Sequence, residues 1–374
     1  MYIVLAILIF GLLIFIHELG HYLTARLFKV KIYEFSIGMG PKFASFRSKK
    51  TDIKYSLGIL PFGGYVSMAG EDQPDDDKSA PDAKSEAEPE AEPEAQQALT
   101  ERETDENALC NKPAWQRFII LSAGSLMNIL FGIVLMCILV SSFKQLSTTT
   151  VKGFYLKEDT GFEISSYESG LRAGDEIIEV DGKRVHIANQ LGYHIMRKGY
   201  EPIELTVIRD GEEKTLLITF PTVEEQGQVL GMVDFATETT EKTFFGTVEH
   251  AFYYSTSTVR MIWESFYDLL TGRYGFEAVS GPVGVTAAIG EAAKVGIPSV
   301  VYLTVVIALN LGIMNLLPIP ALDGGRLFFV IVEMIFRRPI PAKIQNAANA
   351  VGLVLMFALI IVIMFKDTIQ LIIS

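Results

Sequence analysis

Long runs of apolar residues alternate along the chain with segments of more polar sequence. Four runs are long enough to supply the ~20 helical residues that cross a bilayer core. They cover residues 2–28, 118–143, 299–336 and 350–373. This pattern predicts a multi-pass α-helical membrane protein with four transmembrane helices.

The stretch between the second and third runs has the pattern of a folded α+β domain. Short apolar runs at 177–180, 203–208 and 214–220 predict strands, and 187–198 predicts a helix between them. A further short strand is expected near 229–233. Turn signals rich in Gly and Asp separate these elements, so the chain should carry a small inserted domain outside the bilayer.

Two more segments have a recognisable pattern. Aromatic and aliphatic residues recur at helical spacing in 244–270, which predicts either an amphipathic helix on the outer membrane face or a core helix of the inserted domain. Short runs at 42–47, 52–60 and 64–68 follow the first membrane helix. With Pro and Gly at their turns, they predict a small membrane-associated β-hairpin.

Charge is concentrated in one segment. The chain is 49% hydrophobic and 20% charged, with a formal net charge of -12. Residues 71–106 hold fifteen acidic and three basic residues, which leaves 29 of each sign from the 44 and 32 of the whole chain. We therefore expect a disordered acidic insert on a fold with no basic surface for nucleic acid.

Basic residues predict the orientation in the membrane. They cluster after the first run, between Arg26 and Lys54, and again after the third, at Arg337, Arg338 and Lys343. The positive-inside rule places both loops and the acidic insert in the cytoplasm. The N-terminus, the C-terminus and segment 144–298 are then extracytoplasmic, in a protein of the cell membrane. A cleaved signal peptide is the less favoured interpretation of the N-terminus, because no basic residue precedes Tyr2.

The first apolar run contains His17-Glu18-Leu19-Gly20-His21. On a helix, residues i and i+4 share a face, so both imidazoles can reach one zinc ion while Glu18, one residue along, can touch a zinc-bound water. Ionisable side chains inside a membrane span are costly unless they are paired, liganded or in a polar cavity. Two cysteines are too few for a Cys-rich metal site. The pentapeptide therefore predicts a hydrolytic metal site, with His/Glu helix packing as the alternative.

A third protein ligand is expected, since hydrolytic zinc sites usually hold three and leave one position open. Asp323 is the candidate, because it is the only acidic residue between Glu291 and Glu333. It lies in Asn315-Leu316-Leu317-Pro318-Ile319-Pro320-Ala321-Leu322-Asp323-Gly324-Gly325. The prolines and the glycine pair should interrupt the third helix, and a broken helix at membrane depth belongs beside a polar cavity.

These motifs together resemble the site-2 protease family of intramembrane zinc metalloproteases, in its bacterial RseP type. Further similar segments are Gly38-Met39-Gly40-Pro41, residues 61–66, Ala123-Gly124-Ser125-Leu126-Met127-Asn128 and Ser280-Gly281-Pro282. The resemblance covers nearly the whole chain apart from the acidic insert. Departures are Ser125 in place of a usual proline and Met39 in place of an aromatic residue.

The resemblance implies a role for each matching residue. His17, His21 and Asp323 would bind Zn²⁺, and Glu18 would be the general acid/base. Asn128, Asn315, Pro318 and Pro320 would contact the substrate. An interhelical hydrogen bond is the alternative for both asparagines, and it is about as plausible as a substrate contact for Asn128.

Residues 167–182 resemble the turn between helix and strand of a PDZ domain, and they occur once, which implies one PDZ domain. PDZ grooves bind peptide ends by strand addition. The expected binding strand is poorly recognisable in 162–166, so a size filter for bulky ectodomains is the role that the family implies. A structural spacer is the alternative. The hairpin would act as an edge to which an extended substrate adds.

These expectations divide the chain into eight segments. They are the first membrane helix with HELGH (1–36), the hairpin (37–70), the acidic insert (71–107), the second membrane helix (108–143), the PDZ domain (144–222), the amphipathic helix and loop (223–298), the broken third helix (299–336) and the loop with the fourth helix (337–374).

The predicted function is zinc-dependent cleavage of single-pass transmembrane proteins within the bilayer, as in regulated intramembrane proteolysis. An anti-sigma factor already shortened by another protease, or a remnant signal peptide, would be a typical substrate. A cation carrier and a silent membrane scaffold are the two alternatives. Glu18 distinguishes them, because only a protease needs it to activate water.

Overall fold

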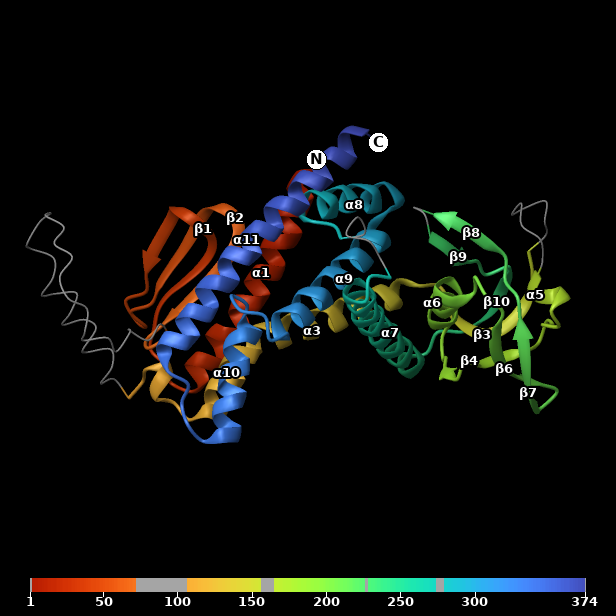
Figure 1. Ribbon diagram of the computed structural model, residues 1–374, viewed down its shortest axis with the longest axis horizontal. Helices are drawn as coiled ribbons and strands as arrows, with labels where there is room; N and C mark the ends of the chain where they lie inside the picture. Colours follow the sequence, from red (N-terminus) through yellow and green to blue (C-terminus); the bar gives the residue numbers. More distant parts are fainter. Residues whose placement is uncertain (1, 72–105, 156–164, 226–227, 274–278, 374) are drawn as a thin grey trace, which may run out of the picture. The chain divides into compact units, whose positions relative to one another are not determined.

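The computed structural model describes all residues except 1, 72–105, 156–164, 226–227, 274–278 and 374. Four helices in the described part are long and apolar enough to span a membrane: α1 (Tyr2–Leu27), α3 (Ala114–Ser142), α9 (Ile297–Leu316) and α11 (Ala342–Ile373). The chain separates into two units, one of residues 1–132 and 267–374 and one of residues 133–266. Figure 1 shows all of these elements. The predicted acidic insert lies almost wholly outside the described residues.

The first unit is built from the membrane helices and α8 (Pro282–Val295), a helix that the sequence pattern did not predict. Leu13 of α1, Ile289 of α8 and Ala308 of α9 are fully buried against one another. Gly20 lets α1 approach α3 closely, because a Cβ at Gly20 would lie 2.4 Å from the carbonyl oxygen of Ala123. Apolar side chains on the outward faces remain exposed, as expected where lipid replaces water.

The third apolar run is two helices. α9 ends at Leu316, residues 317–322 form an irregular connection, and α10 (Asp323–Phe336) follows. The prolines fall in the connection, as predicted, but the prediction that Gly324 and Gly325 also interrupt the helix is wrong. They lie in the first turn of α10, where a Cβ on Gly324 would lie 1.9 Å from the carbonyl oxygen of Leu317. Because the two glycines lack side chains, the first turn of α10 can pack directly against the backbone of residues 316–319.

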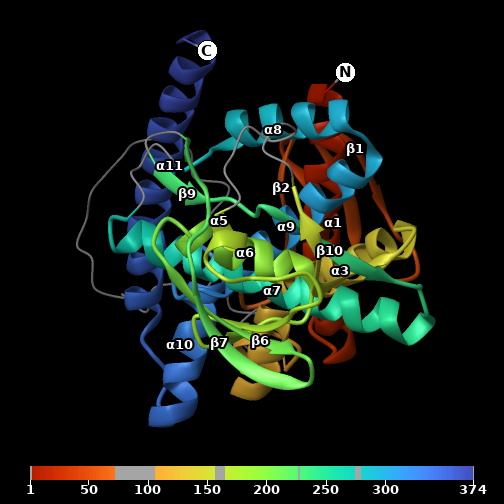
Figure 2. The ribbon, with the colours of Figure 1, turned by 90° about the vertical axis from the view of Figure 1, so that its right-hand side faces the viewer.

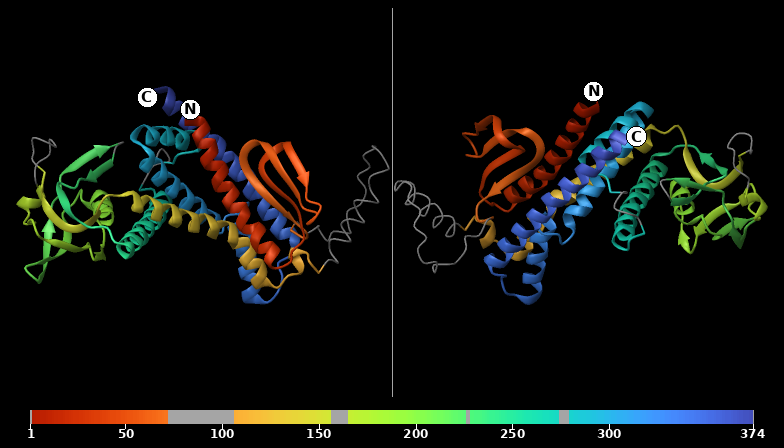
Figure 3. Two further views of the ribbon diagram at one scale, coloured as in Figure 1. Left: turned by 180° about the vertical axis from the view of Figure 1, so that it is seen from behind. Right: turned by 45° about the horizontal axis from the view of Figure 1, so that its top comes forward.

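Strands β1 (Ile32–Arg47) and β2 (Lys54–Met68) pair antiparallel into a two-stranded sheet. Both are longer than the predicted runs, and β1 begins within the segment assigned to the first helix. In its register 32–37 lies opposite 64–68, and 42–47 lies opposite 54–58. The sheet packs alongside α1, and Figure 3 shows this arrangement from two further sides.

The second unit contains an antiparallel sheet with helix α6 (Ala188–Lys198) packed on it, and Figure 2 views this unit from the right-hand side of Figure 1. The strand order is β10-β3-β4-β6-β7, with β5 paired to β4. The strands are β3 (Leu146–Phe154), β4 (Glu176–Val180), β5 (Lys183–Arg184), β6 (Ile203–Arg209), β7 (Glu212–Ile218) and β10 (Phe235–Thr240). A short helix α5 (Ser165–Glu168) and the hairpin of β8 (Thr222–Glu225) and β9 (Gln228–Gly231) complete it.

The sheet extends beyond the expected domain boundary at residue 222, because β10 pairs with β3. Pairing between segments about 90 residues apart leaves no local signal in the sequence. Buried apolar residues from the sheet and from α6, among them Ile177, Ile195 and Phe235, form one core. Most of the predicted binding strand at 162–166 lies outside the described residues.

Helix α7 (Phe244–Leu270) matches the segment predicted to be helical. Its large apolar residues are mainly exposed, as at Phe245, Phe252 and Trp263, whereas small polar residues such as Ser255 and Thr258 are buried. An ordinary core helix buries its apolar face, so the core interpretation does not fit this helix.

Candidate metal centre

The candidate centre begins with the helical spacing of α1. One turn separates His17 and His21, so both imidazoles leave the same side of the helix, and their Nε2 atoms lie 3.3 Å apart. The Oδ2 atom of Asp323 lies 2.9 Å from His17 Nε2 and 3.3 Å from His21 Nε2. The structure therefore brings together the three residues that the sequence predicted as ligands.

The hydrogen bond on the other side of His21 fixes its tautomer. Its Nδ1 lies 2.8 Å from the carbonyl oxygen of Ile120, which can only accept, so Nδ1 carries the proton and donates it. A neutral imidazole then has a lone pair on Nε2, and this lone pair faces the carboxylate of Asp323. Two acceptors this close need a cation between them, and either a proton on Nε2 or a bound metal ion supplies it. An imidazole oriented by a backbone carbonyl is also the usual arrangement of a metal-ligating histidine.

The donor spacing suits zinc. Ligand bonds of about 2.0–2.1 Å in a tetrahedral site put neighbouring donor atoms about 3.3 Å apart. The three observed separations, 2.9, 3.3 and 3.3 Å, are close to that value. Two imidazoles and one carboxylate also leave a fourth position open, which is typical of hydrolytic rather than structural zinc sites.

Glu18 follows the first histidine and is buried. Gly64 of β2 lies directly against it, since a Cβ at Gly64 would be 2.9 Å from Glu18 Cγ and 3.0 Å from the carbonyl oxygen of Ser36. The sheet thus closes one side of the Glu18 side chain. Glu18 is thus buried next to His17 on α1, and its role as general base stays a prediction.

Asp323 reaches the centre because the chain breaks before it. It is the first residue of α10, and the preceding Leu322 is extended. Gly352 of α11 supports the break, because a Cβ there would lie 2.4 Å from Pro320 Cβ. The backbone N–H of Ala321 donates a long hydrogen bond of 3.5 Å to Asn349.

The four residues predicted to contact the substrate lie in different environments. Asn128 is buried in α3, with no hydrogen-bond partner for its Oδ1. Asn315 is half-buried in the last turn of α9. Pro318 is exposed in the connection, whereas Pro320 is half-buried there. Their substrate contacts remain predictions, and the interhelical hydrogen bond considered for Asn128 does not reach its Oδ1.

Several residues at the centre were not assigned from the sequence. Gly124 of α3 is the closest, because a Cβ there would lie 2.3 Å from His21 Nε2 and 2.8 Å from His17 Cε1. Ile120 takes part only through its carbonyl oxygen, which accepts from His21, and Gly64 matters because it has no side chain to collide with Glu18. A pair of small residues inside an apolar run, Ala123-Gly124, is the one sequence signal that marks such a close approach.

A family model, described as peptidase family M50, matches residues 5–359. The chain belongs to this family. A protein of Fusobacterium nucleatum that carries the description zinc metalloprotease is 32% identical over 97% of each chain. One of Clostridium perfringens with the same description is 30% identical over 99% of each chain. The zinc metalloprotease RasP of Geobacillus kaustophilus is 28% identical over 96% of each chain.

Membership of family M50 confirms several predictions. The chain is a zinc metalloprotease, its cofactor is zinc, and its resemblance to the site-2 protease family is correct. The multi-pass membrane character agrees with the four apolar helices. The cation carrier and the silent scaffold are thereby set aside.

Proposed function

We propose that this M50 peptidase cleaves single-pass transmembrane proteins within the bilayer, with Glu18, His17, His21 and Asp323 as its catalytic centre. The observation that carries the proposal is the approach of Asp323 on α10 to two histidines on α1, a helix that also carries the buried Glu18 and is apolar enough to span a membrane. Such groups are costly in lipid and are retained where they perform chemistry.

The chemistry follows from the positions of these residues. Zinc, when bound, polarises the scissile carbonyl and makes water a stronger nucleophile. Glu18 takes the proton of the attacking water, whose oxygen bonds to the carbonyl carbon. The carbon–nitrogen bond then breaks, and Glu18 returns the proton to the leaving amide nitrogen. The products are one carboxyl and one amino terminus.

Hydrolysis requires a substrate backbone that is not helical, since helical peptide groups are already hydrogen-bonded. Segment 64–68 of β2 is proposed as the edge to which an extended substrate adds, because Gly64 lies against Glu18. The unpartnered Oδ1 of Asn128 and the side chain of Asn315 are proposed to bind backbone groups of the unwound chain. Pro318 and Pro320 would line the same path.

The second unit is proposed to be a PDZ domain that limits access by bulky ectodomains and accepts peptide ends. Its support is the single run at 167–182 and the helix α6 beside an antiparallel sheet. The basic residues after α1 and α10 favour an orientation with this unit and both termini outside the cytoplasm and the acidic insert inside. The proposed substrates are a shortened anti-sigma factor or a remnant signal peptide.

The decisive experiment replaces Glu18 by Gln in full-length protein in detergent. This change keeps the shape of the side chain but removes its proton acceptor, so cleavage of a tagged single-span substrate should fall ~10²- to 10⁴-fold. Zinc content, measured by elemental analysis, should stay at one ion per chain. The cleaved fragment is followed on a gel, and a chelator should abolish it.

Two outcomes would contradict this proposal. Full cleavage by Glu18→Gln would remove that residue from the reaction. Wild-type protein that holds zinc but cleaves none of a panel of single-span substrates would exclude this substrate class. A bulky folded ectodomain fused to the same substrate should suppress cleavage if the second unit filters by size.

A further inference from the structure

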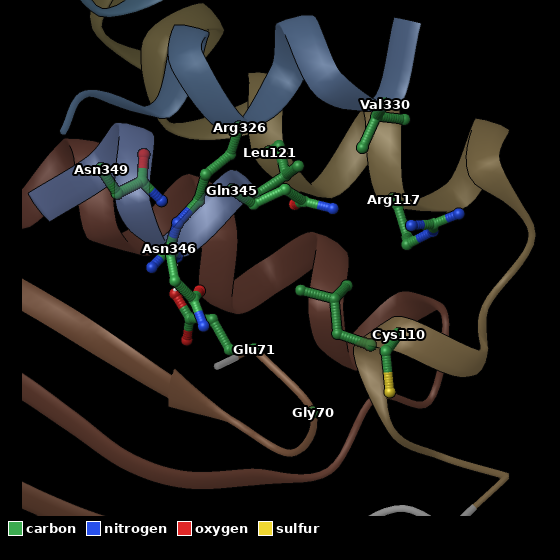
Figure 4. Close-up of a pocket in the computed structure, with 11 residues that line it drawn as sticks. Gly70, Glu71, Cys110, Arg117, Leu121, Arg326, Val330, Gln345, Asn346 and Asn349 are labelled. Carbon is green, nitrogen blue, oxygen red and sulfur yellow. Dashed lines mark hydrogen bonds and ion pairs between the residues drawn. The ribbon is translucent and has the colours of Figure 1, made fainter. Parts of the chain in front are cut away.

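Arg326 lies one helical turn after Asp323 on α10 and forms an ion pair with Glu71. The second carboxylate oxygen of Glu71 accepts a hydrogen bond of 3.3 Å from the backbone N–H of Met68. Figure 4 shows Arg326 extending from its helix towards Asn346 and Glu71. The side chains of Arg326 and Glu71 are 34% and 23% exposed, so water screens this pair only in part.

Backbone hydrogen bonds fix the segment of chain just before Glu71. The backbone N–H of Ala69 donates to the carbonyl oxygen of Lys31 at 2.9 Å, and that of Leu109 donates to the carbonyl oxygen of Ala69 at 2.7 Å. Gly70 has a φ of 68°, and a Cβ there would lie 2.6 Å from Cys110 Sγ. The two ends of the acidic insert are therefore fastened to each other and to the start of β1.

The same strand also reaches the other half of the centre. Glu71 follows the end of β2 by three residues, and Gly64 within β2 lies against Glu18. One stretch of chain, 64–71, thus contacts α1 through Gly64 and α10 through Glu71. These two helices carry all of the ligands.

A small-molecule site is the competing explanation for this polar region. The cavity that Glu71, Arg117 and Arg326 line has a volume of about 60 Å³. This is far below the ~300–1,000 Å³ that is typical of small-molecule sites. Arg117 is also engaged, in an ion pair with Glu333 of α10. The geometry therefore favours a mechanical role.

We propose that Glu71 and Arg326 are positioning residues that clamp the first turn of α10 to the end of β2 and so hold Asp323 at the metal. This inference rests on the metal centre proposed above and extends it. Neither side chain touches the metal or the substrate. Loosening of the pair lets α10 move away from α1, so the third ligand leaves while the two histidines stay in place.

The test uses full-length protein and the zinc ion itself. Glu71→Gln and Arg326→Gln should each weaken zinc binding about 10-fold, the effect expected when support for a ligand is removed. The measurement is competition for zinc with a chromogenic chelator, which does not depend on turnover. Glu90→Gln removes the same charge within the acidic insert and is the matched control. The reversed pair, Glu71→Arg with Arg326→Glu, should recover much of the lost affinity.

Two results would overturn the clamp. One is zinc affinity in Glu71→Gln equal to that of Glu90→Gln. The other is a reversed pair that binds zinc no better than the single variants, which would indicate general damage to the fold. Failure of the proposed function looks different, because wild-type protein would then bind zinc normally but cleave no transmembrane substrate.

Discussion

Gly124 is the residue on which the spacing of the metal centre most depends, and it suggests a sharp test. Replacement by Ala would place a methyl group 2.3 Å from His21 Nε2, where the ligand must move. We expect zinc affinity to fall at least ~10-fold, measured by chelator competition. Gly11→Ala is the control, because it adds the same methyl group to α1 with nothing within 4 Å. Equal zinc affinity in both variants would contradict the described approach of α3.

The sequence predicted those residues whose chemistry conflicts with their surroundings. His17, Glu18, His21 and Asp323 are conspicuous because ionisable groups are rare in apolar runs. Gly124 and the carbonyl of Ile120 could not be predicted in the same way. Their contribution comes from backbone proximity, and proximity is set by how α1 and α3 cross.

At the scale of elements, α6 carries a buried histidine that should respond to acid. Burial lowers the pKa of His194 to about 4, and the nearby positive charge of Lys183 acts in the same direction. The unfolded chain has the higher pKa, about 6.5, so it binds more protons and stability is lost as pH falls from 6.5 towards 4. At pH 5 the expected loss is about 2 kcal/mol.

Amide hydrogen exchange of α6 at pH 7.5 and 5.0, corrected for intrinsic exchange rates, measures this effect. Wild-type protein should lose protection at the lower pH, whereas His194→Asn should lose much less. His186→Asn, which alters an exposed ring stacked on Tyr253, is the control and should keep the wild-type response. An identical response in all three proteins would rule out His194 as the cause.

Element prediction succeeded where one periodicity runs without interruption. The bounds of α1 and α7 agree closely with the predicted ones, because the hydrophobic pattern of a long segment is enough to show where the helix begins and ends. Helix α8 was missed and the role of the glycine pair in α10 was misjudged, since Gly suggests a break unless close packing is known. Pairing of β10 with β3 depends on tertiary contacts that no local pattern contains.

For the whole molecule, the acidic insert should be dispensable. Its two ends are joined by the hydrogen bond between Leu109 and Ala69, and the N–H of Lys31, just before β1, donates to the carbonyl oxygen of Asn107. Removal of 72–105 with a short Gly-Ser linker keeps these contacts and Glu71. Zinc content and cleavage of the single-span substrate should therefore be unchanged. Loss of cleavage with zinc retained would show that the insert takes part in substrate handling.

The separation of the ligands along the chain has a consequence for biosynthesis. Asp323 follows His21 by 302 residues, and a ribosome adds about 5–20 residues per second. About 15–60 s therefore pass between synthesis of α1, which carries two of the candidate ligands, and synthesis of α10, which carries the third. If Asp323 is the third ligand, as proposed, the site is incomplete until this last part of the chain has been made, and cleavage is not expected before then.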